Sequence, residues 1–219
     1  MEHSETEWSL SGQHTSHTDL SLTEDGKKRM QATGVHLIGQ DRLIVPDHIE
    51  KVYVSPRLRA RQTLDLLFES HKDEVKNIPI EVTENIREWE YGDYEGMKTA
   101  DIKALRKSRG LDKDSDWSIW RDGCENGEMP DQVAARLDKL IDEIVSIQRK
   151  AIEENRHSEI LIIAHGHILR CLTLRWVKRE INENPSFILE AGGVGVLSYE
   201  HRNCDEPAIC LGGAFTVPH

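Results

Sequence analysis

The stretch Ile160-Leu-Ile-Ile-Ala164-His-Gly-His-Ile-Leu-Arg170 decides the fold. Its first five residues are unbroken apolar sequence, which is typical of a strand covered on both faces. The His-Gly-His that follows leads into a helical pattern from Ile168 to about Lys178. A buried strand that turns directly into a helix favours an α/β fold with a mostly parallel sheet.

The rest of the chain alternates between strands and helices in the same way. Runs of β-branched and apolar residues predict strands at 50–54, 78–82 and 193–199. Apolar residues at helical spacing predict helices at 24–39, 58–68 and 99–108, and a long helix that opens at Pro130. We therefore expect residues 1–219 to form a single domain, a three-layer α/β/α sandwich around a mostly parallel sheet.

Composition excludes several classes of function. The 219 residues contain 28 Lys and Arg against 39 Asp and Glu, a net charge of −11. That balance argues against a nucleic-acid-binding or membrane-surface protein, since both need a basic face. No stretch approaches the roughly 18 consecutive apolar residues of a spanning helix. The acidic N-terminus also lacks the apolar core of a signal peptide, so we expect a cytoplasmic protein.

The cysteines give no sign of a disulfide framework. None of them has CxxC spacing, and a chain of this length does not need disulfides to hold a core. We expect four reduced structural thiols, at Cys124, Cys171, Cys204 and Cys210.

Ligands of open α/β sheets lie beyond the carboxyl ends of the strands, and this rule selects loops 55–61, 88–96 and 165–167. The first loop carries Arg57, Arg59 and Arg61, whose planar donors match phosphate oxygens. Because these arginines point in different directions at a helix start, we expect only one to face a ligand. A solvated charged turn is the alternative interpretation.

The other two loops contain candidate acid and anion-binding groups. Aromatic residues between the carboxylates of 88–96 can keep a carboxyl protonated, as a general acid requires, and Glu88 is the most protected candidate. An acidic surface loop is the alternative. His165 lies where backbone N–H groups favour anions, unless it is a structural residue. A metal site at His165 and His167 lacks a third ligand nearby.

Together these loops and the N-terminal segment resemble the histidine phosphatase superfamily, the phosphoglycerate mutase clan. The SPxxRAxxT phosphate loop of that family appears at 55–63, and its LxExxxGxxEG acid loop is similar to 86–96. Its HGxxxR motif matches His165, Gly166 and Arg170. Within the clan, REWEYGDYEG, IWRDGCENGE and AGGVGVLSYEH look like the fungal sedoheptulose 1,7-bisphosphatases. The resemblance covers the chain from about residue 3 onward.

The resemblance implies a two-step phosphoryl transfer without metal or cofactor, on a small sugar phosphate such as sedoheptulose 1,7-bisphosphate. His3 would attack phosphorus and form a phosphohistidine, and Glu88 would protonate the leaving oxygen. Arg59 and His165 would hold the phosphoryl oxygens. By the same carry-over, the substrate would contact Gln13, Thr15, Arg59, Tyr91, Gly166 and His167. Loops such as 111–126 would build the rest of the pocket. The sequence does not decide whether the protein forms a homo-oligomer.

The N-terminus departs from the family pattern of an apolar strand followed by Arg-His-Gly-x-Thr. Here Glu2 and Ser4 stand in place of the Arg and the Gly around His3, and the preceding central strand is truncated. Glu2 would put a negative charge where a phosphate dianion binds, and Ser4 would add a side chain where the family has none. Losing one oxyanion donor typically slows turnover by about 10²–10³. Either a longer chain carries the Arg-His-Gly, or the divergence is real.

Three functions therefore stay open. The main one is a sugar-bisphosphate phosphatase. The alternatives are a catalytically impaired or inactive protein that binds a phosphorylated metabolite, and a phosphoglycerate mutase-type phosphotransferase, which needs a lid that excludes water.

Overall fold

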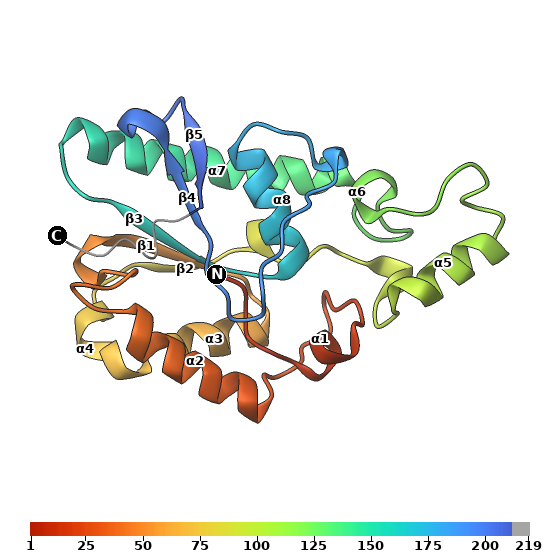
Figure 1. Ribbon diagram of the computed structural model, residues 1–219, viewed down its shortest axis with the longest axis horizontal. Coiled ribbons are helices and arrows are strands. Elements are labelled where there is room, and N and C mark those ends of the chain that lie inside the picture. The colour runs from red at the N-terminus through yellow and green to blue at the C-terminus, as the bar shows by residue number, and fades with distance from the viewer. Residues whose placement is uncertain (212–219) are drawn as a thin grey trace.

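A parallel three-stranded sheet lies at the centre of the molecule. In the computed structural model, which describes residues 1–211, its order is β2 (Ile80–Val82), β1 (Ile49–Val54) and β3 (Glu159–Ile163). Helices cover both faces of this sheet, with α2 (Glu24–Leu37), α3 (Leu58–Leu67) and α4 (Lys72–Val75) on one side and α7 (Pro130–Glu153) and α8 (Gly166–Trp176) on the other (Figure 1). This arrangement confirms the expected three-layer α/β/α sandwich.

The helices agree closely with the sequence patterns, and the long one that opens at Pro130 is the best defined. None of the helices within residues 1–211 is long and apolar enough to cross a lipid bilayer. The helices are α1 (Glu7–Ser11), α2 (Glu24–Leu37), α3 (Leu58–Leu67), α4 (Lys72–Val75), α5 (Thr99–Ser108), α6 (Ile119–Asp122), α7 (Pro130–Glu153) and α8 (Gly166–Trp176).

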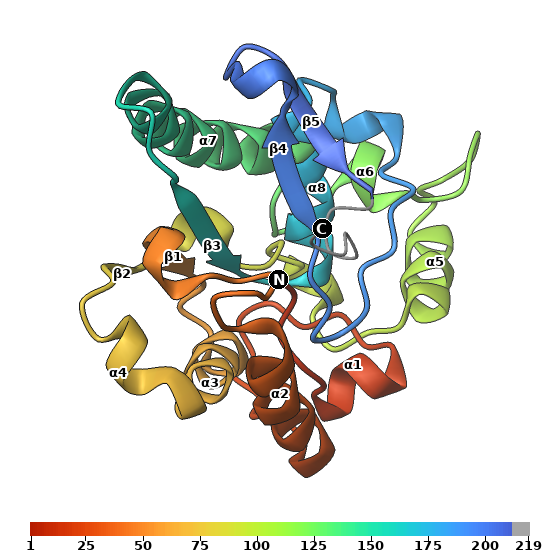
Figure 2. The ribbon, with the colours of Figure 1, turned by 60° about the vertical axis from the view of Figure 1, so that its left-hand side comes forward.

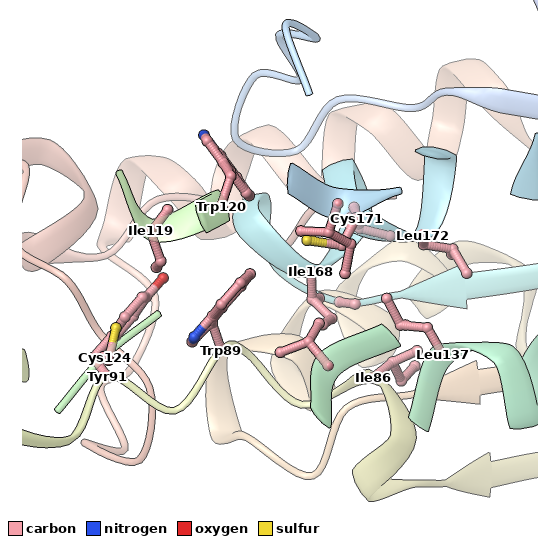
Figure 3. Close-up of a cluster of buried hydrophobic side chains, with 14 of the residues drawn as sticks. Ile86, Trp89, Tyr91, Ile119, Trp120, Cys124, Leu137, Ile168, Cys171 and Leu172 are labelled. Atoms are coloured by element: carbon pink, nitrogen blue, oxygen red, sulfur yellow. The ribbon is translucent and has the colours of Figure 1, made fainter. Parts of the chain in front are cut away.

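The two faces of the sheet carry two separate apolar cores. On β1, Tyr53 faces the core beneath α7 and α8, whereas Val52 and Val54 face the core above α2 and α3. This alternation is what a strand covered on both faces requires. Figure 3 shows the first core, where Trp89 and Trp120 pack edge to face with ring centroids 6.0 Å apart. All four cysteines are free thiols, as expected.

The N-terminal residues pair with the chain at the end of β3. The Met1 amino group donates to the Ile162 carbonyl at 2.7 Å, and the His3 N–H donates to the Ala164 carbonyl at 3.0 Å. On the other side, the Glu2 N–H donates to the Gly193 carbonyl at 3.1 Å. Residues 1–3 therefore join β3 to the segment before β4 (Val196–Tyr199).

The strand predicted at 193–199 is shorter than its sequence pattern. Its first residues pair with the N-terminal segment, and only β4 (Val196–Tyr199) forms a ladder, with β5 (Pro207–Cys210). This antiparallel pair is a sheet of its own and does not hydrogen-bond to β3. Figure 2 shows the pair standing apart from β3.

A buried ion pair fixes the acid loop. Arg136 on α7 binds the Glu128 carboxylate at 2.9 Å and also donates to the carbonyls of Asn85 and Arg87. The same carboxylate accepts the Glu90 N–H at 2.9 Å. Both partners are less than a tenth exposed, and the only other cation bound to Glu128 within residues 1–211 is Arg87, at 2.7 Å. Removing Glu128 would leave the buried Arg136 charge without its counter-ion, and removing Arg136 would leave Glu128 with Arg87 alone.

Two glycines let the acid loop press against the loop that carries Glu128. A Cβ at Gly127 would lie 2.1 Å from the Glu90 carbonyl oxygen, and one at Gly92 would lie 2.3 Å from the Glu125 carbonyl oxygen. Gly92 also has a φ of +52°, which favours glycine. The two loops are in direct backbone contact.

We expect Arg136→Met to lower the free energy of unfolding by about 3 kcal/mol, because the buried Glu128 carboxylate keeps only the more exposed Arg87 as its counter-ion. Urea denaturation measures this loss. The control is Arg149→Met, which removes an exposed ion pair to Asp205 and should change stability little. Equal losses in the free energy of unfolding for the two variants would contradict the expectation that the buried ion pair contributes more than the exposed one.

Candidate active site

A polar cavity of about 440 Å³ opens at the carboxyl ends of β1 and β3, where the three loops selected from the sequence meet the N-terminal segment. This is the location that the rule for open α/β sheets predicts. The lining residues come from five parts of the chain: Glu2, His3, Thr6, Ser9, Gly12, Gln13, His14, Thr15, Arg59, Glu88, Tyr91, Thr99, Gly166, His167, Arg170, Phe187, Ile188 and Leu189.

Arg59 connects the two predicted histidines. Its Nε–H lies 3.2 Å from Nε2 of His3 and 3.2 Å from Nδ1 of His165. The remaining guanidinium nitrogens donate to the carbonyls of Thr15, Ser16 and Thr18. Arg59 is only 1% exposed, and these bonds satisfy its donors inside the protein. Of the three loop arginines, Arg59 alone lines the cavity, as expected.

The hydrogen bonds of His3 define its tautomer. Its Nδ1 lies 2.6 Å from the Ser4 carbonyl, which can only accept, so Nδ1 carries the proton. Nε2 is left with its lone pair facing Arg59. Burial, aided by the charge of Arg59, lowers the pKa of His3 to about 3. His3 is therefore neutral near pH 7 and has a free ring nitrogen at the cavity.

His165, like His3, is a neutral imidazole, but its side chain does not reach the cavity. Its Nε2 donates to the Ser55 hydroxyl at 2.6 Å, and burial with the nearby Arg59 charge lowers its pKa well below the usual value. The two imidazole rings lie edge to face, 4.9 Å between centroids. His165 is fully buried behind His3 and Arg59 and does not line the cavity.

Glu88 sits at the amino end of α8. Its carboxylate accepts N–H groups from Trp89 at 2.8 Å, Ile168 at 3.0 Å and His167 at 3.2 Å. Burial raises the pKa of Glu88, although these N–H groups and the charge of Arg59 act in the opposite direction. A buried carboxyl with a raised pKa at the cavity is suited to giving and taking a proton.

The other predicted substrate-contacting residues also reach the cavity. The Tyr91 hydroxyl lies 2.7 Å from Nδ1 of His167, and Gln13 donates to the Gly96 carbonyl at 2.9 Å. Thr15 and Gly166 complete the predicted set. No residue of 111–126 lines the cavity. Instead, the apolar wall comes from Phe187, Ile188 and Leu189, so the expected contribution of 111–126 is wrong.

Arg170 and His14 also line the cavity but were not predicted as site residues. Arg170 lies over the Trp120 ring at 4.6 Å and faces the cavity, although it appeared in the sequence only as the last position of HGxxxR. His14 stacks on His167, with ring centroids 5.7 Å apart. For His14 no motif gave a signal, because its position depends on how the 12–18 segment folds back over the site.

Glu2 places a carboxyl group in the cavity, close to the start of α8. A Cβ at Gly166 would lie 3.2 Å from its Oε1, and its Oε2 is buried without a hydrogen-bond partner. Burial and the nearby Glu88 raise the pKa of Glu2 to about 8. The negative charge expected at Glu2 is therefore present only above about pH 8.

Ser4 does not enter the cavity. Its hydroxyl donates to the Gly26 carbonyl on α2 at 2.9 Å, and its N–H donates to the Thr63 hydroxyl at 3.1 Å. The side chain expected to crowd the site therefore points toward α2 and is absent from the cavity lining.

One group of potential metal ligands occurs within the described part of the chain. Glu200, His201 and Glu206 lie together on the exposed turn between β4 and β5, and none of them lines the cavity.

Comparisons with known proteins agree with this geometry. A model of the histidine phosphatase superfamily (branch 1) matches residues 1–208. The chain is 45% identical to the sedoheptulose 1,7-bisphosphatase of Saccharomyces cerevisiae, over 100% of this chain and 93% of that protein. It is 32% identical to an acid phosphatase of Mycobacterium tuberculosis, over 92% and 85%. The chain belongs to the histidine phosphatase superfamily.

Solved structures support the same fold. An open reading frame product of Mycobacterium tuberculosis superposes with a TM-score of 0.69 at 27% identity, covering 96% of this chain and 93% of that one. The α-ribazole phosphatase of Shigella flexneri gives a TM-score of 0.71 at 18% identity, with coverage of 96% and 93%.

The raised pKa of Glu2 predicts a pH-dependent stability. Between its ordinary pKa of 4.5 and about 8, the folded chain keeps a proton that the unfolded chain releases, so stability falls as pH rises. Relative to Glu2→Gln, the free energy of unfolding should fall by up to about 1.4 kcal/mol per pH unit in this window.

Urea denaturation from pH 5 to 8.5 measures this difference. Glu2→Gln keeps the size of the side chain and leaves Glu88 to titrate in both proteins. Parallel stability curves for the two proteins would show that Glu2 titrates normally.

Proposed function

We propose that this protein is a phosphatase that hydrolyses a sugar phosphate, such as sedoheptulose 1,7-bisphosphate, through a phosphohistidine at His3 and without a metal. The observation that carries the proposal is the unprotonated Nε2 of His3, which faces Arg59 in a cavity that also holds Glu88. Membership of the family and 45% identity to a sedoheptulose 1,7-bisphosphatase support the reaction class and the choice of substrate.

In the first step, Nε2 of His3 attacks phosphorus and the bond to the sugar oxygen breaks. A phosphoryl oxygen accepts the Nε–H of Arg59, the donor that now faces the two histidines, so positive charge lies where negative charge develops. Glu88 gives its proton to the sugar oxygen. The low pKa of His3 and the raised pKa of Glu88 support these roles, since a nucleophile must be unprotonated and an acid protonated.

In the second step, water attacks the phosphohistidine. Glu88, now ionised, accepts a proton from the water, and inorganic phosphate leaves His3 in its starting state. His165 acts from behind the cavity by holding Arg59. Tyr91, His167, Gln13 and Thr15 contact the sugar, beside the apolar wall at 187–189.

The proposal also covers the domain organisation, the cellular compartment and the kind of partner. The chain works as one domain in the cytoplasm, on a small molecule and not on nucleic acid, in keeping with its net charge of −11. An impaired protein that only binds a phosphorylated metabolite is the second candidate, because Glu2 stands in the cavity. A sugar phosphate that raises the melting temperature without phosphate release would favour this candidate.

We expect His3→Ala to lower phosphate release from sedoheptulose 1,7-bisphosphate by at least about 10³-fold, because the nucleophile is lost. EDTA should leave the activity of the unmodified chain unchanged. His36→Ala, on the exposed face of α2, is the control and should keep full activity. Full turnover by His3→Ala would exclude the phosphohistidine mechanism.

Glu88→Gln should affect substrates according to their leaving group. Hydrolysis of a sugar phosphate should fall by about 10²–10⁴-fold, because an alkoxide leaves poorly without a proton. Hydrolysis of p-nitrophenyl phosphate should fall much less, since nitrophenolate needs no proton. Steady-state kinetics with both substrates, beside the exposed control Glu84→Gln, make the comparison. A uniform loss on both substrates would contradict the acid role.

A further inference from the structure

Glu95 belongs to the acid loop but does not line the cavity, and its carboxylate binds the segment 15–18 instead. Its Oε2 accepts the Ser16 N–H at 2.8 Å and the Ser16 hydroxyl at 2.7 Å. Its Oε1 accepts the Thr18 N–H at 3.0 Å. The Glu95 side chain is only 12% exposed, so water competes little for these bonds. One carboxylate thus gathers three donors of a single short segment.

The same segment binds Arg59 on its other side. The carbonyls of Thr15 and Thr18 accept hydrogen bonds from the Arg59 guanidinium at 2.9 and 3.2 Å. The Thr15 carbonyl and the Ser16 N–H belong to one planar peptide group, in which they point in opposite directions. That peptide group therefore accepts from Arg59 at one end and donates to Glu95 at the other. Hydrogen bonds in such a chain polarise and strengthen one another.

Glu95 acts in this chain as an ionised carboxylate. Burial raises the pKa of Glu95, but the hydrogen bonds from Ser16 and Thr18 outweigh burial and hold the pKa below its usual range. Both oxygens are therefore acceptors near pH 7. A glutamine of the same size has one acceptor oxygen and would turn its NH₂ group toward at least one of the three donors.

The contacts of Arg59 make its orientation depend on the segment 15–18. Its five hydrogen bonds go to two imidazoles and to three carbonyls, and all three carbonyls belong to that segment. The carbonyls hold the two Nη atoms. Because the guanidinium is a rigid plane, they also set the direction of the Nε–H toward His3. A displaced segment would turn this donor away from the place that a phosphoryl oxygen takes.

We propose that Glu95 is a positioning residue for phosphoryl transfer, which fixes the segment 15–18 and, through it, the Arg59 guanidinium beside His3. The effect on turnover rests on the proposed function, whereas the effect on Arg59 does not. Glu95 touches neither the substrate nor a reacting atom. Its loss therefore acts on the transition state through Arg59.

Glu95→Gln keeps the size of the side chain and removes its charge. It should lower kcat for p-nitrophenyl phosphate by about 10–100-fold, since a small misplacement of a group at the reacting centre can cost about 10²-fold. The KM should change by less than about threefold, because the lost stabilisation belongs to the transition state. A sugar phosphate should show the same loss in kcat, because Arg59 acts on the phosphoryl oxygens and not on the leaving group.

Glu90→Gln is the matched control. The Glu90 carboxylate lies 3.1 Å from the Ser16 hydroxyl, but its hydrogen bonds within residues 1–211 come only from side chains, those of Ser16 and His17. Because the backbone of the segment does not depend on it, Glu90→Gln should keep kcat within about twofold.

A double-mutant cycle separates positioning from a general effect on the fold. In an Arg59→Met background, Glu95→Gln should change kcat for p-nitrophenyl phosphate by less than about twofold, because no guanidinium is left to position. A Glu95 that served only to stabilise the protein would lower kcat by the same factor in both backgrounds.

Hydrogen exchange at the Arg59 Nε–H, followed by NMR in the whole chain without substrate, measures the position of Arg59 directly. Exchange should be at least about tenfold faster in Glu95→Gln than in the unmodified chain. If the unmodified chain releases no phosphate, the proposed function fails, while this measurement still decides the role of Glu95. If Glu95→Gln does not fold, Glu95→Asp replaces it. This variant keeps the charge but shortens the reach by one methylene, so it should change exchange in the same direction and by less.

Three results would overturn the proposal. The first is an unchanged exchange rate of the Arg59 Nε–H in the folded Glu95 variant. The second is an equal loss in kcat for Glu95→Gln and Glu90→Gln. The third is an equal loss for Glu95→Gln with and without Arg59.

Discussion

A single buried guanidinium organises the catalytic end of this molecule. Arg59 extends from the first turn of α3 and contacts His3, His165 and three carbonyls of the 15–18 segment. A buried charge is tolerated only where its donors are satisfied. The N-terminal residues, the 15–18 segment and the β3–α8 junction must therefore keep their relative positions to satisfy it, and the cavity forms between them.

The low polarity around Arg59 shifts the pKa values of the histidine and of the carboxyl groups in opposite directions. Burial lowers the pKa of His3, because an imidazolium beside Arg59 is doubly unfavourable, and raises the pKa values of Glu88 and Glu2. The same environment thus yields an unprotonated base and protonatable acids within one cavity. Glu2 shares this behaviour with Glu88 but lacks the backbone N–H bonds that hold the Glu88 carboxyl in place.

Much of the fold could be predicted from local sequence. The apolar run at 160–164 and the pattern after Pro130 identify β3 and α7, because burial on two faces and helical periodicity each leave a clear signal. The predicted phosphate, acid and histidine loops meet at one cavity because each follows a strand or opens a helix, and such loops lie at the same edge of a parallel sheet. Other features of the site depend on long-range packing and could not be predicted from local sequence. The position of His165 behind the cavity, the orientation of Ser4 and the wall at 187–189 depend on contacts between distant segments.

The close contact at Gly92 and Gly127 has a consequence for how this enzyme class can change. The acid loop and the loop carrying Glu128 touch backbone to backbone, and Arg136 binds both. Insertions or bulky replacements in either loop would shift Glu88 together with its neighbours. The 187–189 wall has no such link to the acid. New specificity can therefore arise by variation of that wall, while the loops around the acid diverge slowly and only in concert.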